Sequence, residues 1–381
     1  MQDQDFVRQL QFTHGFGKDI GWSQRLHIDL PMTWLLLLLS ASGLFIIYSA
    51  SGKDIDIVIR QSVYLLIGFI IMLCVAQIPP RLFMIWSKYL YIIGIMLLLV
   101  VLVFGTQSKG AQRWIQLLGV RFQPSEAIKL VMPIIVATYL AKRHLPPSFE
   151  NIVVSLFIIS IPVILIAKQP DLGTSILIGV SGILTLLLAG LRKRLIFSAI
   201  LFAMPLIYVL WHYIMHNYQK QRVLTFLYPE SDPLGAGWNI IQSRIAIGSG
   251  GLYGKGWLMG TQSHLQFLPE SHTDFIIAVL AEEFGFFGCL ALMTIYALII
   301  GRGVFITLNT QTLFNRLLAG SIIITFFVYI FVNIGMVSGI LPVVGVPLPL
   351  ISRGGTSLVT IMIGFGILMS VHTNRSFSRQ P

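Results

Sequence analysis

The stretch that decides the fold is 87–105, SKYLYIIGIMLLLVVLVFG, in which Lys88 is the single charged residue. A helix of about 20 apolar residues is long enough to cross the roughly 30 Å hydrocarbon core of a bilayer. Runs of this kind recur on both sides of this stretch, over most of the chain. The sequence therefore predicts an all-α, polytopic membrane protein.

The apolar runs predict about ten transmembrane helices. They fall at 31–50, 58–78, 87–105, 125–142, 150–168, 173–190, 195–214, 273–300, 316–338 and 349–371. We expect residues 1–381 to form a single integral membrane domain in which 215–272 is one large loop. Segment 1–30 lacks the short apolar core and cleavage site of a signal peptide, so the first span is expected to remain as an uncleaved anchor.

The composition excludes several classes of protein. The 381 residues are 55% hydrophobic and 11% charged, whereas soluble domains carry about 25% charged residues. A soluble enzyme, a disordered chain and a disulfide scaffold are therefore ruled out. The net charge of +11 does not predict nucleic-acid binding, because in a membrane protein the position of each charge matters more than the sum.

The distribution of Lys and Arg predicts the orientation. With the N-terminus in the cytoplasm, the inner segments hold 14 of these residues and the short outer loops hold six. Inner loops of membrane proteins are enriched in positive charge, so both termini are expected to be cytoplasmic, with 1–30 as a cytoplasmic segment and 215–272 extracytoplasmic. Three of the six outer charges lie in one loop, 106–124, which suggests a function for that loop.

The large loop contains one predicted helix. Trp238, Ile241 and Ile245 recur at helical spacing opposite Gln242 and Ser243. This pattern is typical of a short amphipathic helix that lies on a membrane surface. The run Gly248–Gly251 is expected to end it.

Polar residues at the edges of spans are costly and therefore mark candidate sites. Arg113 lies in loop 106–124, and Glu126 and Lys129 follow at the start of the fourth span. Glu126 and Lys129 are three residues apart, so they share a helix face and are expected to pair. Two interpretations stay open: a self-neutralising pair at a helix end, and a pair that faces the substrate. Asp171, between the fifth and sixth spans, is expected to cap a helix.

The richest polar cluster is Glu270, His272 and Asp274, at the start of the eighth span. Partial removal from water there destabilises the charged carboxylate and so makes it a stronger proton acceptor. This property suits a general base. The alternative is a first-turn carboxylate that stabilises the helix dipole. Glu282 and Glu283 lie deeper and need partners, for which Arg353 is a candidate. The small residues around Arg353, in 348–357, favour close helix packing.

The chain has no P-loop, no His-Glu-x-x-His and no Cys-x-x-Cys motif. No metal ligand set is therefore assigned. The side chains of His264, Glu270, His272 and Asp274 together are nevertheless of a kind that attracts a divalent cation.

From the first span onward, the sequence resembles the SEDS family (shape, elongation, division and sporulation proteins). The motifs that carry the resemblance are Gly110–Trp114, Gln123–Glu126 with Lys129, Gln169–Thr174, Ile245–Gln262 and Phe267–Phe275. The stretch Asn333–Gly345 is similar to the elongation branch of the family rather than to the division branch. One departure is Arg353, which stands where the family usually has a tyrosine.

The resemblance implies a glycosyltransferase of the bacterial cytoplasmic (inner) membrane. It implies polymerisation of lipid II into peptidoglycan glycan strands during lateral wall elongation and rod-shape maintenance, with release of undecaprenyl diphosphate. The implied partners are a class B penicillin-binding protein, which is a transpeptidase, and other membrane proteins of the elongation complex.

The resemblance also implies roles for named residues. Asp274 matches the essential aspartate of the family and is expected to act as the base, on the extracytoplasmic side. Glu126 and Lys129 match a polar pair that faces a central cavity. We expect Arg113, Lys129 and either Lys255 or Arg222 to meet the phosphates, alone or with Mg²⁺ or Mn²⁺. Two alternatives are a lipid II flippase and a non-catalytic scaffold for the penicillin-binding protein.

Overall fold

The structure, a computed structural model, describes most of residues 27–374. The undescribed positions in that range are 109–110, 118–119, 193, 196, 199–200, 202–204, 206–207, 216–219, 221–223, 226–227, 229–235 and 262–270. Eight of the described helices are long and apolar enough to cross a membrane, and a ninth apolar helix, α7, is slightly shorter. The expected all-α polytopic fold is confirmed. The predicted span 195–214 is only partly described, because eight of its twenty residues are among the undescribed positions.

The spanning helices differ from the predicted ranges mainly at their ends. Their bounds are α2 (Leu30–Ala50), α3 (Ile55–Ala76), α4 (Pro80–Phe104), α5 (Pro124–Ala141), α6 (Phe149–Lys168), α7 (Leu172–Leu188), α12 (Ile276–Leu308), α13 (Leu313–Val337) and α14 (Thr356–Thr373). A short π-helical turn, η2, spans Leu210–Ile214. Residues 349–355, predicted as the start of the last span, instead form an irregular segment before α14.

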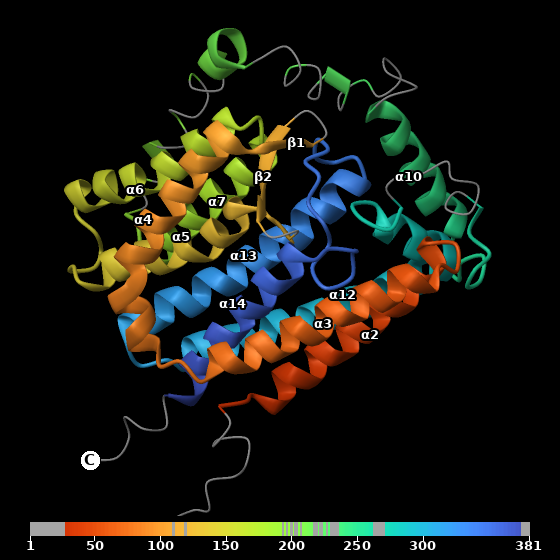
Figure 1. Ribbon diagram of the computed structural model, residues 1–381, viewed down its shortest axis with the longest axis horizontal. Helices are drawn as coiled ribbons and strands as arrows, with labels where there is room; N and C mark the ends of the chain where they lie inside the picture. The colour runs from red at the N-terminus through yellow and green to blue at the C-terminus, as the bar shows by residue number, and fades with distance from the viewer. Residues whose placement is uncertain are drawn as a thin grey trace, which may run out of the picture.

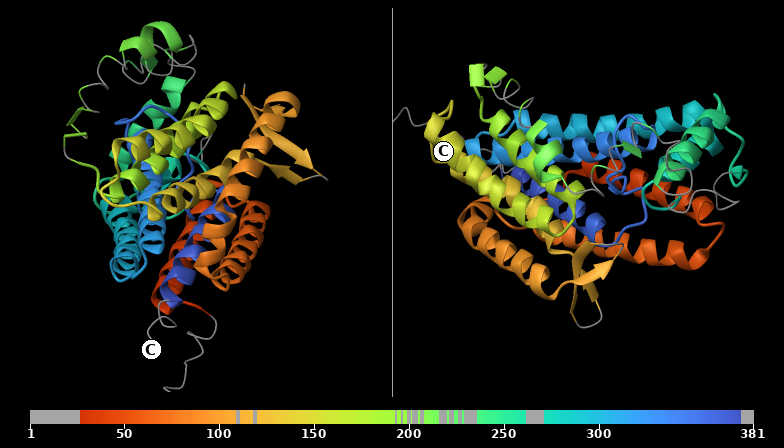
Figure 2. Two further views of the ribbon diagram at one scale, coloured as in Figure 1. Left: turned by 90° about the vertical axis from the view of Figure 1, so that its left-hand side faces the viewer. Right: turned by 90° about the horizontal axis from the view of Figure 1, so that it is seen from above.

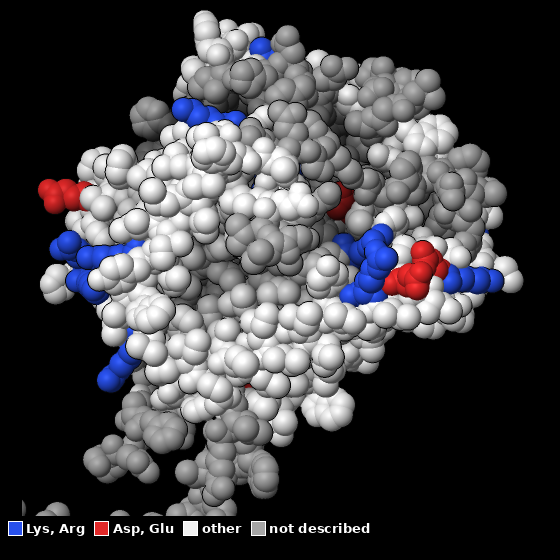
Figure 3. Space-filling model, in the orientation of Figure 1, with Lys and Arg blue, Asp and Glu red and all other residues white. Residues whose placement is uncertain are grey.

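The helices pack around two large hydrophobic cores. Helices α4 to α7 contribute to one core, and α2, α3 and α12 contribute to the other. Helices α13 and α14 add side chains to both cores, and in Figure 1 they lie between the two groups. The face shown in Figure 3 is largely uncharged between groups of charged side chains, as expected for a surface in contact with lipid.

The two ends of the described chain lie at the same end of the bundle. His27 Nδ1 is 2.8 Å from Thr373 Oγ1, and beside them Arg302 makes two contacts of 2.9 and 3.0 Å with the carboxylate of Asp29. The opposite end, at which α3, α5, α7 and α14 begin, carries the turn 271–275 with Asp274. We call it the Asp274 end.

A small antiparallel sheet follows α4 at the Asp274 end. It consists of β1 (Thr106–Ser108), β2 (Ala111–Leu117) and β3 (Val120–Phe122), in that order. Figure 2 shows it projecting from the bundle. The strands were not predicted, because they are short and their pairing depends on chain reversals rather than on a long periodic pattern.

Helix α12 is broken at Gly285, where φ is 63° and ψ is −156°. The backbone groups left unpaired at the break form hydrogen bonds with the segment that follows α10 (Ala236–Gly250). The carbonyls of Glu282 and Glu283 accept from the amides of Lys255 and Gly256, and the amides of Phe286 and Phe287 donate to the carbonyls of Gly251 and Leu252, at 2.9–3.2 Å. Irregular backbone at membrane depth is tolerated where protein groups satisfy it in this way.

The predicted amphipathic helix is α10, which packs against α12 and α13. Its polar edge faces the bundle: Gln242 and Ser243 are buried, and Ser243 Oγ donates to the Val337 carbonyl at 2.9 Å. Ile245 and Ile247 are exposed. A helix is therefore present where the sequence predicted one, and the apolar Ile240 and Ala246 are buried along with Gln242 and Ser243.

Candidate functional site

A cavity of about 1060 Å³ lies between α3 and α14 on one side and α4 and α5 on the other. Its lining changes character along its length. At the Asp274 end it is lined by Arg60, Gln61, Trp114, Glu126, Thr273 and Arg353. Toward the opposite end the lining is apolar and includes Phe83 and Ile367. A cavity with one polar and one apolar end matches the shape of an amphipathic lipid.

Asp274 adjoins the polar end of this cavity through its neighbour Thr273, but it is not one of the lining residues. It is half-buried in the turn 271–275, two residues before α12 begins, rather than inside the predicted span. Thr273, the preceding residue, lines the cavity. The turn is held by the buried side chain of Asn333 on α13, whose Nδ2 donates to the carbonyls of Asp274 at 2.9 Å and Val346 at 2.7 Å.

The expected Glu126–Lys129 pair is confirmed. Lys129 Nζ lies 2.6 Å from Glu126 Oε1, and both side chains are buried in the first turns of α5. Lys129 also lies over the ring of Tyr329, 5.4 Å from its centroid. Glu126 lines the large cavity and Lys129 does not. The pair is thus neutralised internally and presents its carboxylate side to the cavity.

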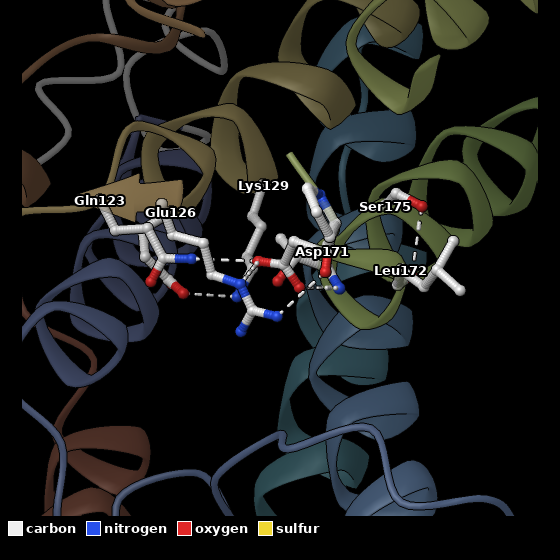
Figure 4. A network of polar contacts seen from close by, with 9 residues as sticks. Gln123, Glu126, Lys129, Asp171, Leu172 and Ser175 are labelled. Carbon is white, nitrogen blue, oxygen red and sulfur yellow. Dashed lines mark hydrogen bonds and ion pairs between the residues drawn. The ribbon is translucent and has the colours of Figure 1, made fainter. Parts of the chain in front are cut away.

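Arg113 on β2 faces Asp171 rather than the cavity. Arg113 Nε lies 3.3 Å from Asp171 Oδ2, and Nη2 donates to the Pro170 carbonyl at 3.3 Å. Asp171 also accepts from the Gln123 amide at 3.4 Å and from the Thr174 backbone amide at 3.3 Å, which confirms the predicted helix cap. Figure 4 shows Gln123 and Asp171 near Glu126 and Lys129.

Lys255 pairs with a carboxylate that the sequence left without an assigned partner. Its Nζ lies 2.7 Å from Glu282 Oε1, which also accepts from the Thr261 amide and hydroxyl at 2.8 Å. Glu283 accepts from the hydroxyl of Ser49 on α2. Arg353 pairs with neither glutamate, so the expected pairing is wrong. The partners come from segments that approach only after the chain has folded.

Arg353 instead joins the cavity to the turn that carries Asp274. Its backbone amide donates to the His272 carbonyl at 3.0 Å, and its Nη1 lies 3.3 Å from His272 Nε2. A guanidinium has donors only, so the His272 nitrogen that faces it is the acceptor. Sequence reasoning also missed Arg60, although a charge inside the predicted span 58–78 was a signal for it.

Three sequence candidates, Arg222, His264 and Glu270, lie outside the described residues. Within the described ranges no three His, Cys, Asp or Glu side chains gather in a metal-binding cluster. Two of the four residues of the expected cation site, His264 and Glu270, are not described, so that site stays a prediction.

The sequence profile of a family described as "Cell cycle protein", which covers FtsW, RodA and SpoVE, matches residues 30–377. The chain belongs to the SEDS family. Over 351 residues it is 55% identical to "Peptidoglycan glycosyltransferase MrdB", the RodA protein of Escherichia coli K12, covering 92% of this chain and 95% of that protein. Against "Probable peptidoglycan glycosyltransferase FtsW" of Idiomarina loihiensis, identity is 36% over 366 residues, covering 92% and 89%. The expected likeness to the elongation branch is thereby confirmed.

Solved structures share the fold of this SEDS chain. One, described as "Structural coordination of polymerization and crosslinking by a peptidoglycan synthase complex", matches with a TM-score of 0.80 and 29% identity, covering 93% of this chain and 99% of that one. The "Rod shape determining protein RodA" of Thermus thermophilus matches with a TM-score of 0.69 and 27% identity, covering 91% and 97%.

Proposed function

We propose that this SEDS protein is a peptidoglycan glycosyltransferase that polymerises lipid II into glycan strands during lateral wall elongation. The observation that carries the proposal is the long cavity whose polar end adjoins Asp274. Lipid II has a diphosphate-linked sugar head and a long isoprenoid tail, and the cavity offers polar residues to the head and an apolar wall to the tail. The names of its close relatives support the same activity.

The reaction joins an acceptor sugar to a donor sugar. Asp274 removes the proton from the 4-hydroxyl of the acceptor GlcNAc as that oxygen bonds to the anomeric carbon of the donor. The bond from the anomeric carbon to the diphosphate breaks, and undecaprenyl diphosphate leaves. Positive side chains at the polar end stabilise the charge of the departing diphosphate.

Charge and geometry support one orientation in the cytoplasmic membrane. Lys and Arg residues are more frequent in the predicted inner segments, which implies cytoplasmic termini. The contact between His27 and Thr373 agrees with both termini being on one side. In this orientation the Asp274 end is extracytoplasmic, where the head group of lipid II is exposed for polymerisation.

We also propose a class B penicillin-binding protein as partner, together with other membrane proteins of the elongation complex. The shared fold with a protein of a synthase complex that couples polymerisation to crosslinking supports this partner. The proposed substrate contacts remain Arg113, Glu126, Lys129, Glu270, His272 and Lys255. A requirement for Mg²⁺ or Mn²⁺ stays a separate prediction.

Purified full-length protein given lipid II in detergent tests the function. Glycan chains should form without a second compartment, and a flippase or a scaffold would make none. Two further arms add the penicillin-binding protein and a chelator, which test the dependence on partner and metal. Unchanged lipid II in every arm would exclude the glycosyltransferase.

A further inference from the structure

Two arginines line the polar end of the cavity without a carboxylate partner. Arg60 projects from the second turn of α3, and Arg353 lies just before α14. Among the described residues neither forms an ion pair. Among the described lining residues the one carboxylate, Glu126, is paired with Lys129. The cavity therefore carries two positive charges that no described side chain neutralises.

Gln61, the neighbour of Arg60, joins α3 to the backbone on both sides of Arg353. The buried Gln61 side chain donates to the Ser352 carbonyl at 3.3 Å and accepts from the Gly354 amide at 3.2 Å. These two bonds bracket Arg353 and fix its backbone against α3. The segments that carry the two arginines are thus joined, and both side chains line the same cavity.

Arg353 is fixed on its other side to the turn that carries Asp274. The bonds from Arg353 to His272 place its guanidinium between the cavity and that turn. An anion bound by Arg353 would therefore lie at the polar end, near Asp274. An attached hydrocarbon chain would follow the apolar lining toward Phe83 and Ile367.

We infer that Arg60 and Arg353 form a binding site for the diphosphate of a lipid-linked ligand. Arginine suits this chemistry because its planar fork of donors matches phosphate oxygens in a bidentate manner. The inference rests on the proposed function for the identity of the natural lipid. It assigns the anion to the α3–α14 wall, whereas the guanidinium of Arg113 and the ammoniums of Lys129 and Lys255 all contact carboxylates.

The test measures binding of farnesyl diphosphate to purified full-length protein in detergent by calorimetry. Farnesol and inorganic diphosphate are the comparison ligands. The variants are Arg60→Gln and Arg353→Gln, with Arg353→Lys to retain the charge. Arg316→Gln is the matched control, because Arg316 is exposed at the start of α13 and outside the cavity lining.

Each cavity Gln variant should raise the Kd for farnesyl diphosphate by roughly tenfold or more. Arg353→Lys should lose less, and Arg316→Gln should bind as the wild type does. Inorganic diphosphate should bind at least roughly tenfold more weakly than farnesyl diphosphate, because it leaves the apolar wall uncovered. Farnesol binding should be the same in wild type and variants.

Wild-type affinity in both Arg60→Gln and Arg353→Gln would overturn the inference, as would an equal loss in Arg316→Gln. Equal affinity for inorganic and farnesyl diphosphate would overturn the lipid-linked ligand. Arg60 is exposed, so its variant tests the site even if Arg353→Gln does not fold. A lipid II polymerisation assay on the same samples separates the two claims. Unaltered binding in both variants of a protein whose wild type makes glycan contradicts only the inference. Lost binding in the variants of a protein whose wild type makes no glycan contradicts only the proposed function.

Discussion

The side-chain amide of Asn333 donates to the backbone carbonyl of Asp274 at 2.9 Å. The same nitrogen donates to the Val346 carbonyl at 2.7 Å, so one buried residue of α13 holds both the Asp274 turn and the loop before α14. The position of Asp274 against the cavity thus depends on a residue 59 positions later in the chain.

Asn333→Leu should therefore reduce both stability and activity. The variant keeps the side-chain size but leaves the two carbonyls without their donor, at a cost of roughly 1–3 kcal/mol for each buried group left unsatisfied. Thermal unfolding in detergent and a lipid II polymerisation assay measure the two effects. Asn315→Leu, at the partly exposed start of the same helix, is the control and should change neither. Full activity in Asn333→Leu would show that the contact does not position Asp274.

The buried Glu126–Lys129 pair should show strong coupling. Lys129→Met or Glu126→Gln leaves one buried partner uncompensated, which typically lowers stability by about 3–5 kcal/mol. The double variant should recover a large part of that loss, because it removes both charges. A double-mutant cycle of unfolding free energies measures the coupling. Additive losses would mean that the two side chains do not depend on each other.

The two glycines that pack at the break in α12, Gly254 and Gly285, should not tolerate a side chain. A Cβ at Gly254 would lie 2.1 Å from the Glu283 carbonyl oxygen, and one at Gly285 would lie 2.4 Å from the Gly254 nitrogen. Both glycines also have positive φ. Gly254→Ala and Gly285→Ala should each lower the melting temperature and the yield of folded protein.

Gly301→Ala is the matched control for these variants, because it lies in the same helix with nothing within 4 Å of the added Cβ. It should be neutral or stabilising by up to about 1 kcal/mol. Equal behaviour of all three alanine variants would contradict the tight packing of the break.

A structural role for Lys255 and a role as a phosphate contact predict different results. Its ion pair with the fully buried Glu282 predicts that Lys255→Met destabilises the protein and that adding Glu282→Gln restores much of the loss. A phosphate contact predicts instead a raised KM for lipid II with unchanged unfolding. Parallel measurement of unfolding and KM separates the two roles.

Local spacing predicted a substantial part of the site. The three-residue separation of Glu126 and Lys129 predicted their pairing, and the position of Asp171 after α6 predicted its capping of α7. Both depend on neighbours in sequence, which helix geometry fixes. The apolar runs likewise predicted the spanning helices, since their length is set by the bilayer.

Contacts between distant segments were not predictable in this way. The partner of Glu282 is Lys255, 27 positions away, and it approaches because Gly285 breaks α12. Arg60 and Arg353 line one cavity because α3 packs against α14. A single sequence contains no periodic pattern that encodes such approaches.

The most direct test of the account is the rate at which purified Asp274→Asn polymerises lipid II. General base catalysis typically contributes about 100- to 10,000-fold, so the variant should be slower by that order. Asp54→Asn, an exposed carboxylate that caps α3 away from the cavity lining, is the control and should retain the wild-type rate. Wild-type polymerisation by folded Asp274→Asn would contradict the assignment of Asp274 as the catalytic base.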